Sequence, residues 1–151
     1  MKLQPLMTYK ATLKQPVDVG AGPFGTRQIF EVTGGEFHGE RLNGRLLTGG
    51  GDWLLIDQRG VGHLDVRGTF ETDDGAAVYV QYYGVLVLNE KVGTALATGG
   101  ETDFGDTHFM VQPRFETGDE RYAWLNDVVA VAEGRVAPSA VEYCVFECVN
   151  D

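Results

Sequence analysis

The sequence predicts an all-β protein, folded as a single antiparallel β-barrel of about eight to nine strands with one short helix. Short runs of alternating apolar and polar residues follow one another along the chain. Glycine makes up 21 of 151 residues, which is about twice its usual share. These glycines are scattered without a fixed period, as expected for turns, bulges and tight corners. No stretch resembles a linker, so we expect residues 1–151 to form one domain.

Apolar runs of the length expected for strands recur along the chain. We predict strands at 6–14, 26–33, 36–47, 52–57, 62–72, 76–88, 107–116, 125–135 and 139–149. The helix candidate is 89–97, where Asn89 is a suitable N-cap and Gly99-Gly100 provide a stop. A barrel and a strongly twisted sandwich both suit this order of elements, and the barrel is our prediction.

The clearest hairpin joins 63–73 to 76–88 through Asp74-Gly75. An Asp-Gly pair between alternating runs favours a two-residue type I′ turn, which fixes the register of both strands. In that register Arg67 lies opposite Tyr82, and side chains that lie opposite share a face. One face then holds Leu64, Val66, Phe70, Tyr79, Gln81 and Tyr83, and the other Asp65, Arg67, Thr69, Val78, Val80 and Tyr82.

Charge and the N-terminus exclude several classes of protein. The chain has 12 Lys and Arg against 22 Asp and Glu, a formal net charge of −10. Generic binding to nucleic acid or to anionic membranes requires positive charge, so we expect neither partner. The N-terminus lacks the apolar core and cleavage site of a signal peptide. No window approaches the roughly 18 apolar residues of a membrane helix, and we expect a cytoplasmic protein.

Two motifs that often carry chemistry are interpreted as structural. Residues Gly20 to Gly25 match the dinucleotide pattern GxGxxG, but a strand follows where a helix N-terminus is needed. The histidines His38, His63 and His108 lack the spacing of metal ligands. We therefore predict no metal site and no cofactor.

The two cysteines are predicted to be reduced structural thiols. Cys144 and Cys148 lie four residues apart, on one face of a predicted strand. Their Cα atoms would be roughly 13 Å apart, whereas a disulfide requires less than about 7 Å. They cannot pair with each other.

The 63–88 hairpin has two mixed faces, which is typical of a small barrel with a ligand cavity. Asp65 and Arg67 are two residues apart on one strand, with Tyr82 opposite Arg67. In a water-poor cavity a carboxylate beside a guanidinium stays ionised, and a tyrosine can donate to a carbonyl or oxyanion. A solvated outer face explains the same alternation, and both interpretations remain open.

The second candidate region is 107–116 with the loop that follows it. Arg114 and Glu116 alternate with apolar residues, and the loop is rich in aromatic and charged groups, including Trp124. In one interpretation this loop gates a pocket mouth where Arg114 or Glu116 reaches a ligand. In the other, the aromatic residues plug a barrel end and Arg114 pairs with Glu116. The apolar face of the predicted strand 107–116 consists of Phe109, Val111 and Phe115.

Five segments carry a family resemblance, in order along most of the chain. They are Gly34-Gly35-Glu36-Phe37-x-Gly39-x-Arg41-Leu42-x-Gly44, Gly50-Gly51-Asp52-Trp53, Leu64-Asp65-Val66-Arg67, Thr72-Asp73-Asp74-Gly75-Ala76 through Tyr79, and Pro113-Arg114-Phe115-Glu116-Thr117-Gly118-Asp119-x-Arg121-Tyr122-x-Trp124-Leu125-Asn126. The chain resembles the small bacterial and fungal family catalogued as domain of unknown function 3237. The resemblance implies a calycin-like or allene-oxide-cyclase-like barrel that self-associates into a homo-oligomer, and it implies no particular reaction.

The chain also departs from the pattern of that family. Gly68 stands where an aromatic residue is common, and Gln81-Tyr82-Tyr83 replaces a more basic stretch. These departures predict a specialised and more aromatic pocket.

The leading hypothesis is an enzyme that moves a proton on a small apolar or aromatic carbonyl compound without a cofactor: an isomerase, cyclase or lyase. It needs a general base, an oxyanion stabiliser and an apolar wall. The candidate general base is Asp65 or Glu116. The candidate stabiliser of the enolate oxygen is Arg67 or Arg114, with a hydrogen bond from Tyr79 or Tyr82. The predicted aromatic wall consists of Trp53, Tyr83 and Trp124.

Two alternatives remain open. One is a non-catalytic module that binds and carries a small molecule. The other is a structural oligomerising barrel, which predicts a solid interior with Asp65 and Arg67 facing solvent or a subunit interface.

Overall fold

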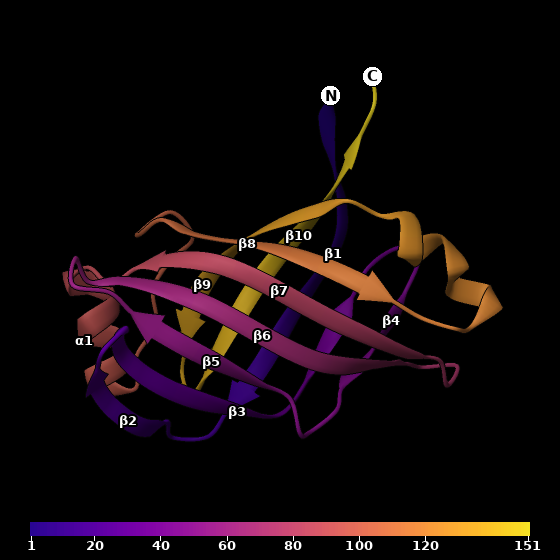
Figure 1. Ribbon diagram of the computed structural model, residues 1–151. Coiled ribbons are helices and arrows are strands. Elements are labelled where there is room, and N and C mark those ends of the chain that lie inside the picture. The colour runs from indigo at the N-terminus through magenta and orange to yellow at the C-terminus, as the bar shows by residue number, and fades with distance from the viewer.

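The computed structural model describes residues 1–151 as ten β-strands and two short helices (Figure 1). The helices are α1 (Glu90–Thr98) and the 3₁₀ helix η1 (Glu120–Asp127). The strands are β1 (Lys2–Leu13), β2 (Val17–Gly22), β3 (Gly25–His38), β4 (Asn43–Leu46), β5 (Gly51–Ile56), β6 (Val61–Thr72), β7 (Ala77–Val87), β8 (Phe109–Glu116), β9 (Ala130–Ala137) and β10 (Ala140–Val149).

These strands form one antiparallel sheet that closes into an eight-stranded barrel. Neighbours follow the order β1, β10, β9, β8, β7, β6, and β3 pairs with β1 to complete the ring. β4 and β5 together fill one place between β6 and β3, each pairing with a different part of both strands. β2 lies outside the ring, paired with β3. The predicted antiparallel barrel is confirmed.

Several predicted boundaries differ from the structure. β2 covers Gly20–Gly22, where no strand was predicted, and η1 replaces the start of the strand predicted at 125–135. β3 runs through Gly34 and Gly35, where a break between two strands was predicted; their φ angles are 155° and 137°. A Cβ on Gly35 would collide with the carbonyl oxygen of Lys10 on β1. These glycines let β3 bend closely against β1 instead of ending there.

The predicted helix is present as α1. The Asn89 side chain accepts a hydrogen bond from the Val92 amide at 3.1 Å, which caps the first turn. Gly99 ends the helix in the left-handed conformation with a φ of 67°. The second helix, η1, was not predicted.

The hairpin between β6 and β7 has a three-residue turn. The Thr72 amide donates to the Ala76 carbonyl at 2.8 Å, and Gly75 has a φ of 91°. A left-handed residue in the last position is typical of a three-residue loop with a G1 bulge. The predicted two-residue turn is therefore wrong.

The extra turn residue shifts the register by one. Val66 lies opposite Tyr82, and Arg67 lies opposite Gln81. Because side chains alternate between the two faces of a strand, the shift exchanges the faces of β7 relative to β6. Tyr82 is inside the barrel with Val66, whereas the prediction placed it beside Asp65 and Arg67. The β7 residues that leave the predicted apolar face for the outside are Tyr79, Gln81 and Tyr83.

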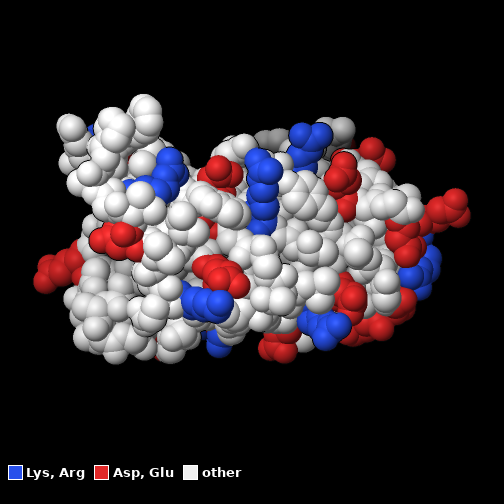
Figure 2. Space-filling view, turned by 60° about the horizontal axis from the view of Figure 1, so that its bottom comes forward, with Lys and Arg blue, Asp and Glu red and all other residues white.

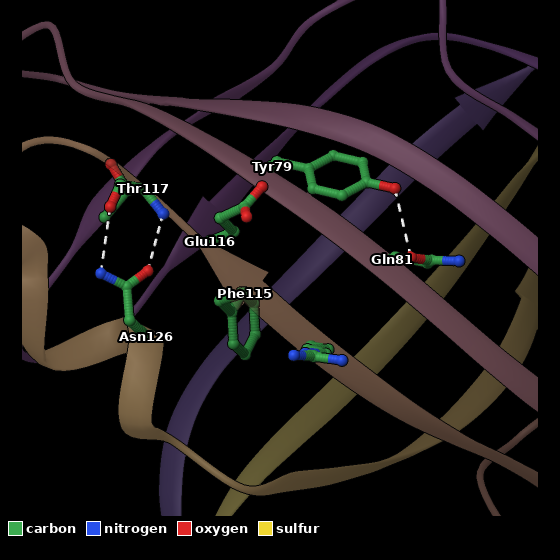
Figure 3. A pocket seen from close by; sticks show the side chains of 7 residues that line it. Tyr79, Gln81, Phe115, Glu116, Thr117 and Asn126 are labelled. Atoms are coloured by element: carbon green, nitrogen blue, oxygen red, sulfur yellow. Dashed lines mark hydrogen bonds between the residues drawn. The ribbon is translucent and has the colours of Figure 1, made fainter.

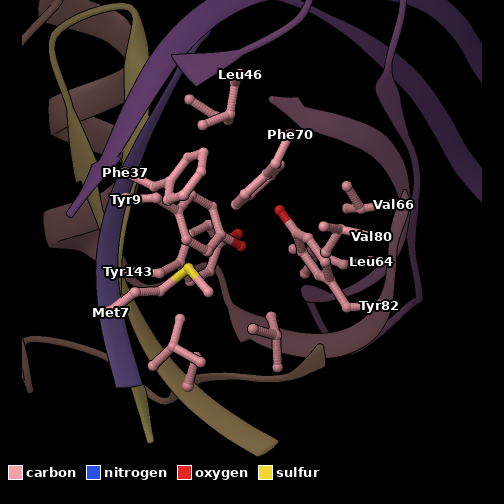
Figure 4. Close-up of a cluster of buried hydrophobic side chains, with 14 of the residues drawn as sticks. Met7, Tyr9, Phe37, Leu46, Leu64, Val66, Phe70, Val80, Tyr82 and Tyr143 are labelled. Carbon is pink, nitrogen blue, oxygen red and sulfur yellow. The ribbon is translucent and has the colours of Figure 1, made fainter. Parts of the chain in front are cut away.

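Apolar and aromatic side chains line the barrel interior (Figure 4). Tyr9 is central to this cluster, since its ring centroid lies 4.8 Å from that of Tyr143 and 5.1 Å from that of Phe70. Glycine makes room for these rings at some positions. A Cβ on Gly134 would lie 2.9 Å from the rings of Phe109 and Tyr143. Part of the high glycine content thus reflects close packing of large rings inside the barrel.

The two helices lie at opposite ends of the barrel. α1 links β7 to β8 and buries Val92 and Ala95, whereas η1 links β8 to β9 and buries Leu125. η1 is also tied to the β6–β7 turn, because the Tyr122 hydroxyl donates to the Asp74 carboxylate at 2.9 Å. This turn and η1 therefore stabilise each other.

The surface charges agree with the composition. On the face drawn in Figure 2, Lys and Arg side chains are isolated, several of them beside an acidic side chain, and form no continuous basic patch. Neither helix has the length and apolar character needed to span a bilayer.

Candidate functional site

The predicted site residues fall on two sides of the barrel wall. Asp65 and Arg67 on β6 and Tyr83 on β7 point outward, while Tyr82 alone points into the interior. Trp124 lies apart on η1, where the guanidinium of Arg41 stacks 4.0 Å from its ring centre. The remaining outward-facing candidates are Trp53, Tyr79, Arg114 and Glu116.

An outer groove of about 550 Å³ brings three of these candidates together (Figure 3). It contains Glu116, Arg114 and Tyr79, the predicted candidates for the base, the oxyanion stabiliser and the tyrosine that assists it. Arg114 and Glu116 form no ion pair with each other, contrary to the structural interpretation of that pair. The groove is lined by Tyr79, Gln81, Arg114, Phe115, Glu116, Thr117 and Asn126.

Hydrogen bonds fix the walls of this groove. The Tyr79 hydroxyl donates to Gln81 Oε1, and Gln81 Nε2 donates to the Tyr83 hydroxyl, both at 3.2 Å. On the other side, Asn126 accepts from the Thr117 amide at 2.8 Å and donates to its carbonyl at 3.0 Å. The Asn126 contacts join η1 to the end of β8, so the groove has an ordered shape.

A second group of polar side chains lies inside the barrel, around Asp52 on β5. Asp52 is opposite Phe30 on β3 and Val66 on β6, and Val66 is opposite Tyr82. Directly opposite residues share a face. The Asp52 carboxyl therefore projects from the inner wall into a mainly apolar interior.

The surroundings of Asp52 change its acidity. The pKa of Asp52 is raised to about 7, chiefly by burial and also by the negative charge of Asp65. The Asp65 amide donates to Asp52 Oδ1 at 3.0 Å, and this bond acts in the opposite direction, as does the charge of Arg27. A carboxyl with a pKa near 7 exchanges protons readily at neutral pH, which is the property of a general acid or base.

Three tyrosine hydroxyls lie in the barrel interior (Figure 4), and two of them, those of Tyr82 and Tyr143, are close enough to Asp52 to be affected by its charge. Burial raises the pKa of Tyr82 to about 12, and Asp52 contributes to this shift through its negative charge. Burial also raises the pKa of Tyr9 and of Tyr143. All three phenols therefore remain protonated hydrogen-bond donors at neutral pH. The Tyr9 hydroxyl is buried and has no hydrogen-bond partner, so it can bind a polar atom that enters the interior.

The interior opens to solvent on the side of β3 and β5. Inward-facing side chains can be partly exposed only where solvent reaches the inside. Gln28, Phe30 and Asp52 are partly exposed, whereas Val66 and Tyr82 on the facing wall are buried. Along this part of β3 the outer neighbour is β2 instead of β1, which leaves the ring less tightly closed.

Two glycines, Gly50 and Gly68, leave the barrel wall near Asp52 without side chains. A Cβ on Gly50 would lie 2.9 Å from the Cα of Gly68, so these two backbones touch. Gly68 is opposite Val80 on the inner face, and a Cβ built on Gly68 meets no atom within 4 Å. Space therefore remains at the inner wall next to Asp52.

The histidines and cysteines lie elsewhere. His63 contacts Asp57 at 2.9 Å on the β5–β6 hairpin, and His38 lies 3.7 Å from Glu36. Cys144 and Cys148 are free thiols. No three His, Cys, Asp or Glu side chains come together as a set of metal ligands.

Asp52, Tyr9 and Tyr143 are not among the site residues predicted from the sequence. One signal for Asp52 was present, because strand alternation places it on the same face as Leu54 and Ile56. The opposite face, with Trp53 and Leu55, is equally apolar, so the pattern alone could not decide which face is inside. No sequence signal brings Tyr9 and Tyr143 to Asp52, because their proximity depends on closure of the ring through β1 and β10.

Comparisons with known proteins identify the family. The model of the protein family described as "Protein of unknown function (DUF3237)" matches residues 1–148. A UPF0311 protein of Rhodopseudomonas palustris is 34% identical over 120 residues, which cover 80% of this chain and 78% of that protein.

Solved structures agree with this match. A β-barrel-like protein from Acinetobacter baumannii is 33% identical with a TM-score of 0.81, over 97% of this chain and 94% of that one. A conserved protein of unknown function from Rhodopseudomonas palustris is 29% identical with a TM-score of 0.87, over 99% of both chains. An enzyme from Penicillium herquei shares the fold at 19% identity and a TM-score of 0.70, over 97% and 92% of the two chains. The chain belongs to the DUF3237 family, as its sequence resemblance indicated.

Proposed function

We propose that the barrel is an enzyme that transfers a proton on a small, largely apolar or aromatic carbonyl compound, with Asp52 as the general base. The observation that carries this proposal is a carboxyl group on the inner face of an apolar barrel, partly open to solvent and close to the protonated hydroxyls of Tyr82 and Tyr143. The shared fold with an enzyme from Penicillium herquei supports the idea that such a barrel can carry catalysis.

Asp52 is a better base than the carboxylates predicted from the sequence. Glu116 is exposed on the outer groove, where water competes for each of its interactions. Asp65 points outward, with its Oδ1 atom buried and without a hydrogen-bond partner. Asp52 combines partial withdrawal from water with an inner wall of apolar residues, which matches the surroundings of tuned catalytic carboxyls.

The reaction needs two events at neighbouring atoms. Ionised Asp52 takes a proton from the carbon next to the carbonyl group, and the electron pair of the broken C–H bond forms a C=C bond. The π electrons of the C=O bond move to oxygen, where the Tyr82 hydroxyl stabilises the new charge by donating a hydrogen bond. Protonated Asp52 then returns the proton to the same carbon or to another, which gives exchange or isomerisation.

The apolar interior selects the substrate class. Phe30, Leu54 and Val66 share the inner face with the carboxyl and favour hydrocarbon or aromatic groups. The open space at Gly68 leaves room for part of the substrate. A charged substrate would lose its hydration without compensation, so we expect neutral ketones or aldehydes.

The test is proton exchange in deuterated water at pH 8, followed by NMR. Cyclohexanone, phenylacetone and β-tetralone serve as enolisable probes. We expect exchange above the buffer rate for at least one probe, and a loss of about 10²-fold or more in Asp52→Asn, the range typical of a general base. Tyr82→Phe should lose about 10²-fold, as expected for an oxyanion donor.

Glu71→Gln is the matched control, because Glu71 lies on the outer face of β6 and pairs with Arg45 at 2.9 Å. Its exchange rate should equal that of the parent. Loss of exchange in Glu116→Gln but not in Asp52→Asn would place the reaction in the outer groove. Exchange at the buffer rate for every probe would contradict the enzymatic proposal.

The second candidate function is non-catalytic binding of a small molecule, favoured by the unpartnered Tyr9 hydroxyl in the interior. Binding of 4-nitrophenol, which resembles an enolate, without exchange of any ketone would support it. Self-association and a cytoplasmic location stay predictions. Sedimentation of the purified protein tests the first of these directly.

A further inference from the structure

We infer that Arg67 and Arg114 form a second site, on the outer face of the barrel, that binds the carboxylate or phosphate group of a small molecule. This site is separate from the one around Asp52, because the two lie on opposite faces of the same wall. Its occupant does not depend on the proposed reaction.

The two arginines lie in one row across three strands. Arg67 on β6 is directly opposite Gln81 on β7, and Gln81 is directly opposite Arg114 on β8. The strands are about 4.8 Å apart, so the two Cα atoms are roughly 10 Å apart. Long arginine side chains can reach a common ion from that separation.

These two arginines have no partner, unlike every other arginine of the chain. Arg41, Arg45, Arg59, Arg121 and Arg135 form ion pairs with carboxylates, and Arg27 donates to the Trp53 carbonyl. Arg67 and Arg114 form no ion pair or hydrogen bond within the protein. In a chain with 22 acidic residues and 12 basic ones, two adjacent cations without an acidic partner are available for an external anion.

The residues between the arginines present donors. Tyr79 donates to Gln81, and Gln81 donates to the Tyr83 hydroxyl. This direction leaves the hydroxyl hydrogen of Tyr83 and the second amide hydrogen of Gln81 without an internal acceptor. With the two guanidinium groups, they form a surface of donors beside the 550 Å³ groove that contains Arg114 and Gln81. Charge-assisted hydrogen bonds of this kind favour planar carboxylates and phosphates.

Glu116 limits the position of the anion. It lies one row further along, opposite Tyr79, and also lines the groove. Asp65 lies one row along in the other direction, opposite Tyr83, so an anion bound between the two arginines has a carboxylate on each side of the row. Repulsion from Glu116 and Asp65 weakens the binding, and the two guanidinium groups offset it.

The experiment is a titration of the ¹⁵N-labelled full chain with benzoate and, separately, with inorganic phosphate at low salt. We expect saturable shifts of backbone amides on β6, β7 and β8 around Arg67, Gln81 and Arg114. Arg67→Gln and Arg114→Gln should each weaken binding by about tenfold or more, since each removes a charged hydrogen-bond donor. Neutral benzamide should produce no such shifts, and 0.5 M NaCl should reduce the affinity.

Two further variants sharpen the result. Arg45→Gln removes a cation that is paired with Glu71 on the neighbouring strands and should leave the affinity unchanged. Glu116→Gln should strengthen binding, because it removes the nearby negative charge. The anion that binds more tightly, benzoate or phosphate, shows whether the natural ligand presents a carboxylate or a phosphate group.

The inference is overturned if neither anion shifts these amides, or if Arg114→Gln binds as tightly as the parent. It is also overturned if the parent is a dimer that Arg67→Gln or Arg114→Gln dissociates. In that case the carboxylates of a second copy of the chain occupy the two arginines.

Discussion

Tyr82 and Tyr83 are neighbours on β7, yet they lie in opposite environments. Tyr82 is 5% exposed and packs with Tyr9 and Tyr143 inside the barrel, whereas Tyr83 is 57% exposed on the outer face. The carboxylates differ in the same way, since Asp52 faces inward and Glu116 outward. Residue type alone therefore says little about chemistry here. The face of the wall decides whether a side chain takes part in acid–base chemistry or binds an ion from solvent.

The largest expected difference is in stability. Tyr82→Ala removes a buried ring and should destabilise the fold by about 3–5 kcal/mol, the usual cost for a large aromatic residue in a core. Tyr83→Ala should change stability by no more than about 0.5 kcal/mol, as for a surface position. Urea denaturation of both variants measures the contrast. Equal losses of stability in the two variants would contradict the assignment of Tyr82 to the inner face and Tyr83 to the outer face of β7.

The next largest effect concerns Asp52 and pH. Its pKa is about 7 in the folded state against 3.8 as the ordinary value, so between these values the folded protein binds more protons than the unfolded chain. Stability therefore falls as the pH rises through this window. Asp52→Asn, which lacks the ionisable group, should be more stable than the parent by about 2–4 kcal/mol at pH 8.

This advantage should shrink toward zero as the pH falls to about 4, because Asp52 is then protonated in both states. Thermal unfolding of both proteins at several pH values measures it. The exchange activity of the parent should rise with pH through the same midpoint, near 7. A stability difference that does not change with pH would show that Asp52 ionises normally.

A smaller effect is expected at two inward-facing glycines of the β6–β7 ladder. A Cβ on Gly84 would lie 2.6 Å from the Met110 carbonyl and would also collide with Val111, whereas a Cβ on Gly68 meets nothing within 4 Å. Gly84→Ala should therefore cost about 1–3 kcal/mol. Gly68→Ala should be neutral or slightly stabilising. A large loss in Gly68→Ala would argue against open space beside Asp52.

The smallest effect is expected for the outer arginines. Arg67→Gln and Arg114→Gln should leave the free energy of unfolding within about 0.5 kcal/mol of the parent, because neither side chain has an internal partner. Chemical denaturation with and without benzoate measures this. Destabilisation of either variant in the absence of an anion would assign that arginine a structural role.

The fold class and much of the local structure follow from the amino-acid sequence alone. Period-two alternation predicted β8 and its apolar face of Phe109, Val111 and Phe115, which the structure confirms. Asn89 and Gly99 predicted the limits of α1, because caps act within one turn of the chain. Alternation and capping are local effects, so they can be read without knowledge of the partners.

The tertiary structure decided which face of each strand is inside and which residues meet there. One additional residue in the turn at Gly75 exchanged the faces of β7 relative to β6. Asp52 acquired its raised pKa from apolar walls and from Asp65, and Tyr9 and Tyr143 reached it only because β1 and β10 close the ring. Alternation shows which residues of a strand share a face, but it does not show which face lies inside the barrel. Burial, which sets the pKa of a carboxyl, depends on contacts between strands that are far apart along the chain.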